Sequence, residues 1–575
     1  MATTNLFRKK SIDVILKQIE TDGGEGEHVS LNKVLTVRDL TALGIAAVIG
    51  AGIFSTVGKA CFDGGPGVIF LFIITAIACG FSALCYAEFA SRIPVSGSAY
   101  TYSYAAFGEI IAWIIGWDLI MEYAIGNITV AISWSSNLLS FLNNVGVHFP
   151  EYLATSYMTV EKAHTSFLEL TTQGGTIPES IQQLNSLWEN APHIGTLPLI
   201  INIPALLITF IISILVYIGI HETRTSSNIM VAFKLVVIIA VIAIGFFYVN
   251  PENWVPFAPN GFSGIMRGVS AVFFAYIGFD AISTTAEECK DPQRDLPKGM
   301  FYSLIICTIL YILIALVLTG MVKYTNLNVG DFLANAFNER GLNFLGGIIA
   351  LSAVVATSSV LLVFQLGQPR IWMSMSRDGL LPPKFSKLHP KYKTPAFSTI
   401  VAGLLVGIPS LILDSDLVTD LTSIGTLFAF VLVCGGILVL PRESNSPGKF
   451  RLPYINGKYI IPILFVLGMF VAYFIDNTLF SRFFSLSDSD NPGLSSFEVI
   501  RERLPYYLFF ILTVLITLYS YIRSYSLIPV LGLISCFYLM TELGVHNWER
   551  FVIWLIIGMV IYFFYSRKNS RLAKL

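Results

Sequence analysis

The sequence predicts an all-α membrane protein with about fourteen transmembrane helices. Of its 575 residues, 54% are hydrophobic and only 13% are charged, and its mean hydropathy is +0.70. Soluble domains carry about 25% charged residues, so this composition excludes an ordinary soluble protein. Apolar runs of about 20 residues, the length that crosses a bilayer as a helix, recur along most of the chain. The net charge of −1 gives no reason to expect nucleic acid as a partner.

Each expected span is an apolar run bounded by polar or charged residues. The spans are 39–60, 67–91, 105–142, 197–220, 228–249, 263–287, 300–322, 343–366, 396–414, 419–440, 459–480, 505–523, 526–543 and 548–565. An even number places both ends of the chain on one side of the membrane. The pattern after residue 455 leaves the exact count open. Residues 1–38 contain no removable leader, so the first apolar run is expected to be retained as a span.

Charges in the connections predict the orientation, because Lys and Arg gather in cytoplasmic loops. Segments 367–394 and 567–575 are basic, whereas segment 143–196 has five glutamates against one lysine. The segment 1–38 and the tail 567–575 are therefore expected in the cytoplasm of a cell-membrane protein. The insertion 143–196 is expected outside, folded as a small cap, and 481–504 is a second external connection. The cysteines lie mostly in apolar runs and are expected to pack as small hydrophobic residues, with no spacing for metal.

The first span carries a pair of glycines in its middle. Gly50 and Gly52 lie within LGIAAVIGAGIFSTVG, residues 43–58. Glycine in a helix interior favours opening of the helix, and opened backbone at membrane depth is tolerated only when it is buried in protein or lines a cavity. The alternative is that the small residues only let two helices approach closely.

The sixth span also carries a glycine in its middle, which favours the interpretation that the helix opens. It contains VFFAYIGFDAIST with Gly278 and Asp280, and the two spans are corresponding members of two halves, spans 1–5 and 6–10. Span 1 runs outward, so its outer half begins with free N–H groups that suit a carboxylate. Span 6 runs inward, so its first half ends with free carbonyls that suit an ammonium. A zwitterion with both groups on one carbon, an α-amino acid, fits between them.

Ionisable residues inside spans are functional candidates. Lys234 is a single cation in the otherwise apolar span 5, and we expect it to donate to opened span 1 and to Ser358 or Ser359 of span 8. A buried lysine can load and release a proton during a transport cycle. The alternative is that Lys234 extends to the cytoplasmic interface.

Buried carboxylates form a second group of candidates. Asp118 and Glu122 share a face of span 3, and with Asp280 they either line the cavity or pair with one another and with tyrosine hydroxyls. At the cytoplasmic ends of spans lie charged residues that are either gate-forming ion pairs or solvated charges: Glu88, Arg92, Glu287 and Glu288. The run SRDGLLP, residues 376–382, is expected to cap a helix end.

Four runs together resemble one family. They are GIAAVIGAGIF (44–54), LCYAEFASRIPVSGSAYTYSYAAFGEIIAWIIGWDLIMEY (84–123), FFAYIGFDAISTTAEE (273–288) and GQPRIWMSMSRDGLLP (367–382). They resemble the cationic amino acid transporter branch of the amino acid–polyamine–organocation superfamily, which includes bacterial proton-coupled permeases. The resemblance implies a leucine-transporter-like fold of two inverted five-helix repeats in residues 39–440. It implies four further helices in 441–566, two of them inserted before the final pair.

The resemblance also implies a binding site. It places the substrate carboxylate at N–H groups of Ala51 and Gly52 beside Gly50, and it assigns proton coupling to Lys234. The carbonyls that it places around the substrate ammonium are those of Val48, Phe274, Ala275 and Ile277. Bacterial relatives often have Thr at the position of Ala51, so one hydroxyl contact is missing here.

The resemblance places Phe364 at the side-chain end of the pocket, where its bulk favours small or medium neutral amino acids. Transport of arginine, lysine or a polyamine, and exchange of one amino acid for another, stay open. An ion channel also stays open, although filter-like carbonyl repeats are absent. An enzyme is not expected, because the chain has no HExxH, no GxSxG and no ligand-spaced His/Cys set. The expected partners are an amino acid, protons and lipids, with no cofactor and no metal, and a small accessory membrane subunit is left open.

Overall fold

The computed structural model describes residues 6–12, 14–15, 31–50, 52–173, 177–195, 197–327, 332–441, 450–475, 478–485 and 495–573. Within these residues the fold is helical, and its sheet is a single antiparallel pair of two-residue strands, β1 (His193–Ile194) and β2 (Leu197–Pro198). The predicted all-α fold class is confirmed. Ala51, which was expected to contact substrate, lies outside the described residues.

The helices follow the expected spans closely. In the first part of the chain they are α2 (Val37–Val48), η1 (Gly52–Thr56), α3 (Val57–Gly64), η2 (Gly65–Gly67), α4 (Val68–Arg92), α5 (Ser98–Ala106), α6 (Glu109–Ile120), η3 (Met121–Ile125), α7 (Gly126–Asn144), η4 (Glu151–Leu153), α8 (Tyr157–Gln173), α9 (Glu179–Asn190), α10 (Ile203–Ile218) and α11 (Ile220–Phe246). In the middle part they are η5 (Pro251–Trp254), α12 (Gly261–Arg267), α13 (Val269–Tyr276), η6 (Phe279–Glu288), α14 (Pro292–Met321), η7 (Tyr324–Asn326), α15 (Phe332–Asn338), α16 (Asn343–Arg377), η8 (Pro383–Ser386), α17 (Ala396–Ser410) and α18 (Ser415–Val439). In the last part they are α19 (Ile460–Ile475), α20 (Leu479–Phe484), α21 (Ser496–Arg523), α22 (Leu527–Thr541), α23 (Val545–Ile561), η9 (Tyr562–Ser566), α24 (Arg567–Asn569) and η10 (Arg571–Ala573).

The described helices have the length and composition of a multi-pass membrane protein. Nine helical stretches among the described residues are long and apolar enough to cross a bilayer, and four shorter apolar helices accompany them. Large apolar side chains are exposed on the outer helices, for example Ile214 on α10 and Val466 on α19. Such a surface is stable in lipid rather than in water.

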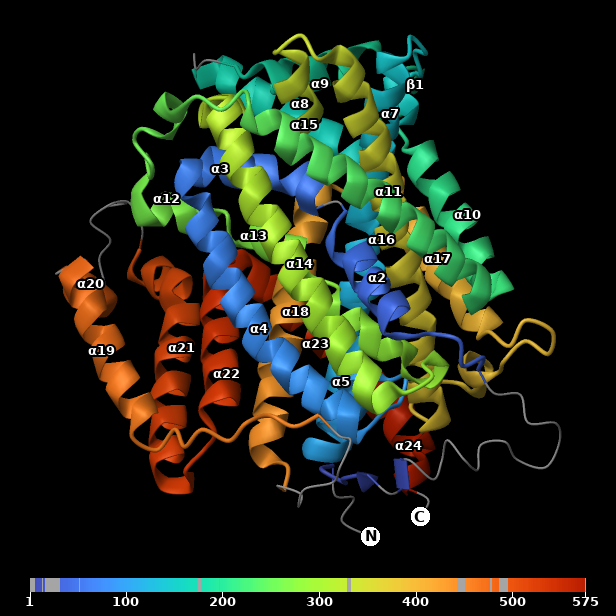
Figure 1. Ribbon diagram of the computed structural model, residues 1–575, viewed down its shortest axis with the longest axis vertical. Coiled ribbons are helices and arrows are strands. Elements are labelled where there is room, and N and C mark those ends of the chain that lie inside the picture. Colours follow the sequence, from blue (N-terminus) through green and yellow to red (C-terminus); the bar gives the residue numbers. More distant parts are fainter. Residues whose placement is uncertain are drawn as a thin grey trace.

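A central group of helices surrounds the interior of the molecule. Helix α14 packs along both α2 and α4, α16 packs along α7, and α18 packs against α22. In Figure 1, α19, α20, α21 and α22 form a separate row at one side of this group. Of the elements in that row, α19 packs against α21, so it is the most peripheral helix.

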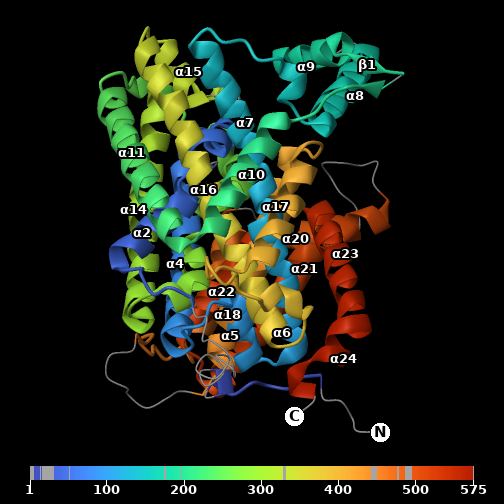
Figure 2. The same ribbon diagram turned by 90° about the vertical axis from the view of Figure 1, so that its right-hand side faces the viewer.

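Both ends of the described chain lie at one end of the molecule. Lys10 Nζ lies 2.6 Å from Asp378 Oδ1, and the Arg571 N–H donates to the Asp378 carbonyl at 3.0 Å. Glu109, at the start of α6, accepts from the Ser570 hydroxyl at 2.6 Å. Helices α8 and α9 lie at the opposite end, as Figure 2 shows. Within the described part of segment 143–196, α8 and α9 make apolar contacts of their own around Val160.

One expected boundary is wrong. Span 8 was expected to end at residue 366 and to be followed by a basic loop, but α16 continues to Arg377. Arg370 is therefore inside the helix, and its side chain is fully buried. Burial of Arg370 in this helix is stabilised because Glu288 binds its guanidinium through two hydrogen bonds, of 2.8 and 2.6 Å. The run that follows ends the helix as predicted, with Gly379 at φ +80°.

Candidate substrate site

The first span is interrupted at its glycines, as predicted. Helix α2 ends at Val48, and Ile49 adopts an extended conformation with φ −84° and ψ 100°. The chain becomes helical again at Gly52, where the wider π-helical turn η1 begins. In a π-helical turn the backbone N–H and carbonyl groups are displaced from the regular hydrogen-bonding pattern of an α-helix.

The sixth span is interrupted in the same manner. Helix α13 ends at Tyr276, Ile277 is extended, and Gly278 has a φ of +112° before η6 begins. A residue with a side chain is strained at this φ. A Cβ at Gly278 would also lie 2.6 Å from the Cβ of Ala47 in α2. Glycine is therefore required at this position for two reasons.

The two interruptions touch each other. A Cβ on Gly52 would lie 2.5 Å from the Cα of Ala275, and a Cβ on Gly50 would lie 2.0 Å from a methyl carbon of Val360. The two interpretations of the glycine pair, an opened helix and a close helix contact, therefore both apply. The helix opens at these glycines and also approaches its neighbours through them. The carbonyl ends of α2 and α13 are brought to one place in the interior.

A tyrosine from a third helix bridges the two interruptions. The hydroxyl of Tyr311 in α14 lies 2.6 Å from the Val48 carbonyl oxygen and 2.7 Å from the Ala275 carbonyl oxygen. The Phe274 carbonyl accepts from the N–H of Ile277 at 3.3 Å. The sequence analysis missed Tyr311. The signal was weak, because Tyr311 is one of five hydroxyl-bearing residues in span 7, with Tyr302, Ser303, Thr308 and Thr319.

Lys234 points inward and is fully buried. Its ammonium donates to the carbonyls of Ile45, Ala46 and Ile49 at 3.1, 3.2 and 2.5 Å. The hydroxyl oxygen of Ser359 in α16 lies 2.8 Å from the same nitrogen, so the three N–H groups of the ammonium are shared among four acceptors. This geometry does not match the alternative, in which the Lys234 side chain extends to the cytoplasmic interface of the membrane. The lysine instead joins α11 to the last turn of α2 and to α16.

Ser358 faces a different neighbour. Its hydroxyl accepts from the indole N–H of Trp134 at 2.8 Å and donates to the Val354 carbonyl at 2.8 Å. Adjacent residues on a helix point in directions about 100° apart, so only one of the two serines can face Lys234. The structure brings Ser359, not Ser358, to the ammonium.

The buried carboxylates gather on one side of the interruption in span 6. Asp118, Glu122 and Asp280 are each at most 1% exposed. Glu122 and Asp280 are close enough to interact electrostatically, and the Tyr123 hydroxyl donates to Asp280 at 3.4 Å. Both carboxylate oxygens of Asp118 and of Glu122 have no hydrogen-bond partner among the described residues, so only the expected contact with a tyrosine hydroxyl is present, at Asp280.

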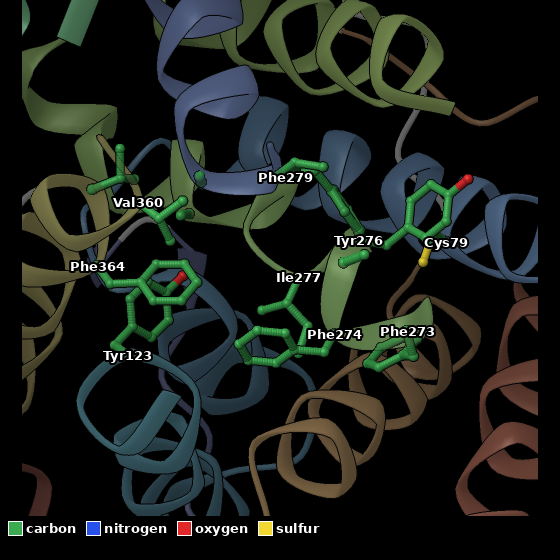
Figure 3. Packing of buried hydrophobic residues seen from close by; sticks show 14 of the residues in the cluster. Cys79, Tyr123, Phe273, Phe274, Tyr276, Ile277, Phe279, Val360 and Phe364 are labelled. Carbon is green, nitrogen blue, oxygen red and sulfur yellow. The ribbon is translucent and has the colours of Figure 1, made fainter. Parts of the chain in front are cut away.

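Aromatic and aliphatic side chains from α16 and η3 pack beside these carboxylates. The rings of Phe364 and Tyr123 meet edge to face, with centroids 5.7 Å apart. Figure 3 shows both rings on the side of Val360, facing the side chains of Ile277 and Phe274. Phe364 is 2% exposed, and its ring lies 3.2 Å from the position that a Cβ on Gly278 would take. Phe364 is therefore packed directly against the interruption in span 6.

Ion pairs hold the end of the molecule where the chain termini lie. Glu288, at the end of η6, pairs with Arg370, and both side chains are at most 1% exposed. The neighbouring Glu287 pairs with Arg377 at 3.0 Å and accepts from the N–H of Ser96 at 3.2 Å. Of the two readings of these glutamates, the structure matches ion pairs between helices rather than solvated charges. They tie span 6 to span 8.

Comparison with known proteins decides the family. A family model described as amino acid permease matches residues 35–487, and a model of the permease C-terminus matches residues 525–570. The chain belongs to the amino acid permease family. It is therefore a membrane transporter and not an enzyme.

Individual relatives of this permease cover almost its whole length. It is 36% identical to the branched-chain amino acid permease BcaP of Bacillus subtilis over 99% of both chains. It is 33% identical to the methylthioribose transporter of the same bacterium, over 99% of this chain and all of the relative. It is 32% identical to the vacuolar cationic amino acid transporter 4 of Arabidopsis thaliana, over 99% of this chain and 96% of the relative.

Proposed function

We propose that this permease is a secondary active transporter that carries L-amino acids into the cell by alternating access. The observation that carries the proposal is the meeting of two interrupted spans in the interior, where Gly52 and Ala275 touch through their backbones. Interrupted spans at corresponding places of two halves are typical of substrate sites in secondary transporters.

The proposal includes an architecture and an orientation. The helical segments from α2 to α18 form two inverted five-helix repeats within residues 39–440. The helices within 441–566 add four spans, so the chain crosses the cell membrane fourteen times with both ends in the cytoplasm. The stretch 109–144, which carries three carboxylates, is counted among these spans. The basic segments near the termini support this orientation.

Backbone groups of the two interruptions recognise the α-amino acid. The N–H groups of Ala51 and Gly52, at the positive start of the outer half of span 1, bind the carboxylate. The carbonyls at the ends of α2 and α13 bind the ammonium, namely those of Val48, Phe274, Ala275 and Ile277. Recognition by backbone is independent of the side chain of the amino acid, so specificity within the class comes from the walls of the pocket.

Small or medium neutral amino acids are the favoured substrates. Phe364 fills the side-chain end and leaves less room for a long cationic side chain. The branched-chain permease of Bacillus subtilis, at 36% identity, supports this choice. A cationic amino acid is the second candidate, supported by the relatives named as cationic amino acid transporters.

Protons drive the transport through Lys234. A charged lysine donates to the last turn of α2 and to Ser359, so it stabilises one arrangement of span 1 against α11 and α16. Loss of the proton removes one donor and the charge, which weakens this arrangement and favours movement of α2. The buried carboxylates Glu122 and Asp280 line the same interior.

Binding and flux measurements test the proposal. The purified permease is screened against the twenty amino acids by thermal shift, because a ligand that binds only the folded state raises Tm. The best ligand is then followed in vesicles with an acidic exterior and no amino acid inside. Saturable uptake that ends when the pH gradient is collapsed is expected. Stabilisation by none of the twenty, or unsaturable ion current in their absence, would contradict the transporter assignment.

A further inference from the structure

The hydroxyl of Tyr311 occupies an unusual position for a buried donor. It lies within 2.7 Å of two carbonyl oxygens, one at the end of α2 and one at the end of α13. A hydroxyl has a single proton, so it can donate to only one of these carbonyls at a time. Three oxygen atoms therefore share one proton in a fully buried place.

This arrangement leaves hydrogen-bonding capacity unused. The carbonyl that does not receive the proton keeps its lone pairs facing the hydroxyl oxygen, and close oxygens without a proton between them repel. Burial raises the cost of such an unsatisfied group. One further donor, carrying positive charge and several protons, would satisfy the three oxygens together.

We infer that Tyr311 is a positioning residue of the ammonium subsite: its hydroxyl holds the Val48 and Ala275 carbonyls at one point and offers its own oxygen to the substrate ammonium. This inference rests on the proposed function. A primary ammonium has three N–H donors, so it can bond to both carbonyls and to the Tyr311 oxygen at the same time. The subsite therefore selects a primary α-amine over a hydroxyl at the same carbon, since a hydroxyl brings one proton and no charge.

The surroundings of Tyr311 fix its hydroxyl in place. Its ring packs edge-on against Tyr276, with centroids 5.4 Å apart, and lies at a tilt of 34° to Phe72, with centroids 5.7 Å apart. Tyr276 is itself buried, and its hydroxyl donates to the Phe72 carbonyl in α4 at 3.2 Å. Tyr276 therefore offers a matched control, because Tyr276→Phe also removes one buried hydroxyl from the same aromatic cluster but leaves both interruptions untouched.

The test compares amino acids with their hydroxy-acid counterparts. Dissociation constants are measured on the purified full-length permease for L-alanine and L-lactate, L-valine and L-2-hydroxy-3-methylbutanoate, and L-leucine and L-2-hydroxy-4-methylpentanoate. Hydrogen bonds to charged groups contribute about 1.5–3 kcal/mol, so Tyr311→Phe is expected to weaken amino acid binding about tenfold or more. The hydroxy acids should stay within about twofold, and Tyr276→Phe should change neither class.

The outcomes separate the inference from the proposed function. Wild-type protein that binds none of the three amino acids contradicts the proposed function itself. A wild type that binds them, with Tyr311→Phe weakening both ligand classes equally or neither, overturns the role of Tyr311 alone. If Tyr311→Phe does not fold, 3-fluorotyrosine at position 311 replaces it. Its fluorine resonance should shift with the amino acid and not with the hydroxy acid, and an unchanged resonance with the amino acid overturns the inference.

Discussion

At the scale of single residues, the interior of this permease is organised by donors that reach backbone carbonyls. Lys234 lies against the carbonyls of Ile45 and Ala46 in the last turn of α2 and of Ile49 just beyond it, and Tyr311 lies against the carbonyl of Val48 between them. In an intact helix each backbone carbonyl already accepts a hydrogen bond from the N–H group four residues later. Side-chain donors to backbone carbonyls therefore matter most where the helix ends and carbonyls lack this partner. The end of α2 at Val48 makes these carbonyls available to side chains from α11 and α14.

Replacing Lys234 by Met is expected to abolish uptake driven by an acidic exterior. The substitution keeps an apolar side chain of similar length but removes the charge and the N–H donors. Uptake of the best amino acid ligand into vesicles, with and without a pH gradient, measures the effect. The Ile49 carbonyl loses its donor, which also lowers the free energy of unfolding by about 1–3 kcal/mol.

The control for this substitution is Lys59→Met. Lys59 is half exposed near the other end of the molecule, paired with Asp416 at 3.3 Å. Its removal also deletes one cation, and pH-driven uptake should continue. Undiminished pH-driven uptake in Lys234→Met would refute the coupling role of Lys234.

Replacing Phe364 by Ser is expected to widen the range of substrates. Removal of the ring opens the side-chain end beside Tyr123 and Val360, so arginine and lysine should begin to compete for uptake of the neutral substrate. The matched control is Phe344→Ser in the same helix, where the ring is 85% exposed. Competition by arginine in neither variant, or in both, would show that Phe364 does not limit the pocket.

At the scale of elements, the two interruptions depend on a backbone-to-backbone contact. Gly52 and Ala275 approach so closely that even one methyl group on Gly52 would meet a Cα atom, which cannot rotate away. Overpacking of this kind costs about 1–3 kcal/mol in well-packed interiors. The contact fixes η1 against α13 and therefore fixes the relative position of the two half-helices.

Gly52→Ala is accordingly expected to reduce both uptake and Tm. Thermal shift measures the stability, and vesicle uptake measures the activity. Gly80→Ala in α4 is the control, because a Cβ at Gly80 would meet nothing within 4 Å. There the change should be neutral or stabilising by about 0.5–1 kcal/mol, since alanine is the better helix former. Equal behaviour of the two variants would contradict the close-contact explanation.

At the scale of the whole molecule, the end that carries both chain termini is closed by ion pairs between helices. The pair of Glu288 with Arg370 is buried, so breaking it by removing one partner leaves an uncompensated charge and costs about 3–5 kcal/mol. Cys289 follows Glu288 directly. Burial raises the pKa of the Cys289 thiol to about 12, so its reactive thiolate is scarce at neutral pH.

Maleimide labelling of Cys289 should therefore report opening of this end. Wild-type labelling at pH 7.5 is expected to be slow. Arg370→Met should accelerate it at least about tenfold, because opening returns the thiol toward water and lowers its pKa toward the ordinary value. The double variant Glu288→Gln with Arg370→Met should return toward the wild-type rate, since no charge is left unpaired.

Cys61 in α3, near the opposite end of the molecule and also buried, provides the internal control. Peptide mapping by mass spectrometry reads both cysteines in one sample. An equal rise at Cys61 would indicate general unfolding. No rise at Cys289 in Arg370→Met would show that the ion pair does not close this end.

The amino acid sequence by itself determined the all-α membrane fold, the places of the two interruptions and the choice of Lys234 as a candidate, whereas the structure decided that Lys234 points inward. The features that the sequence determined are local properties, because hydropathy, glycine pairs and a lone cation can be read within a single segment. Only the tertiary structure decided that Ser359 rather than Ser358 meets Lys234, that Arg370 lies inside α16 beside Glu288, and that Tyr311 bridges the two interruptions. Each of these contacts joins segments far apart in the chain, and its formation depends on distances of a few tenths of an ångström that no local pattern encodes.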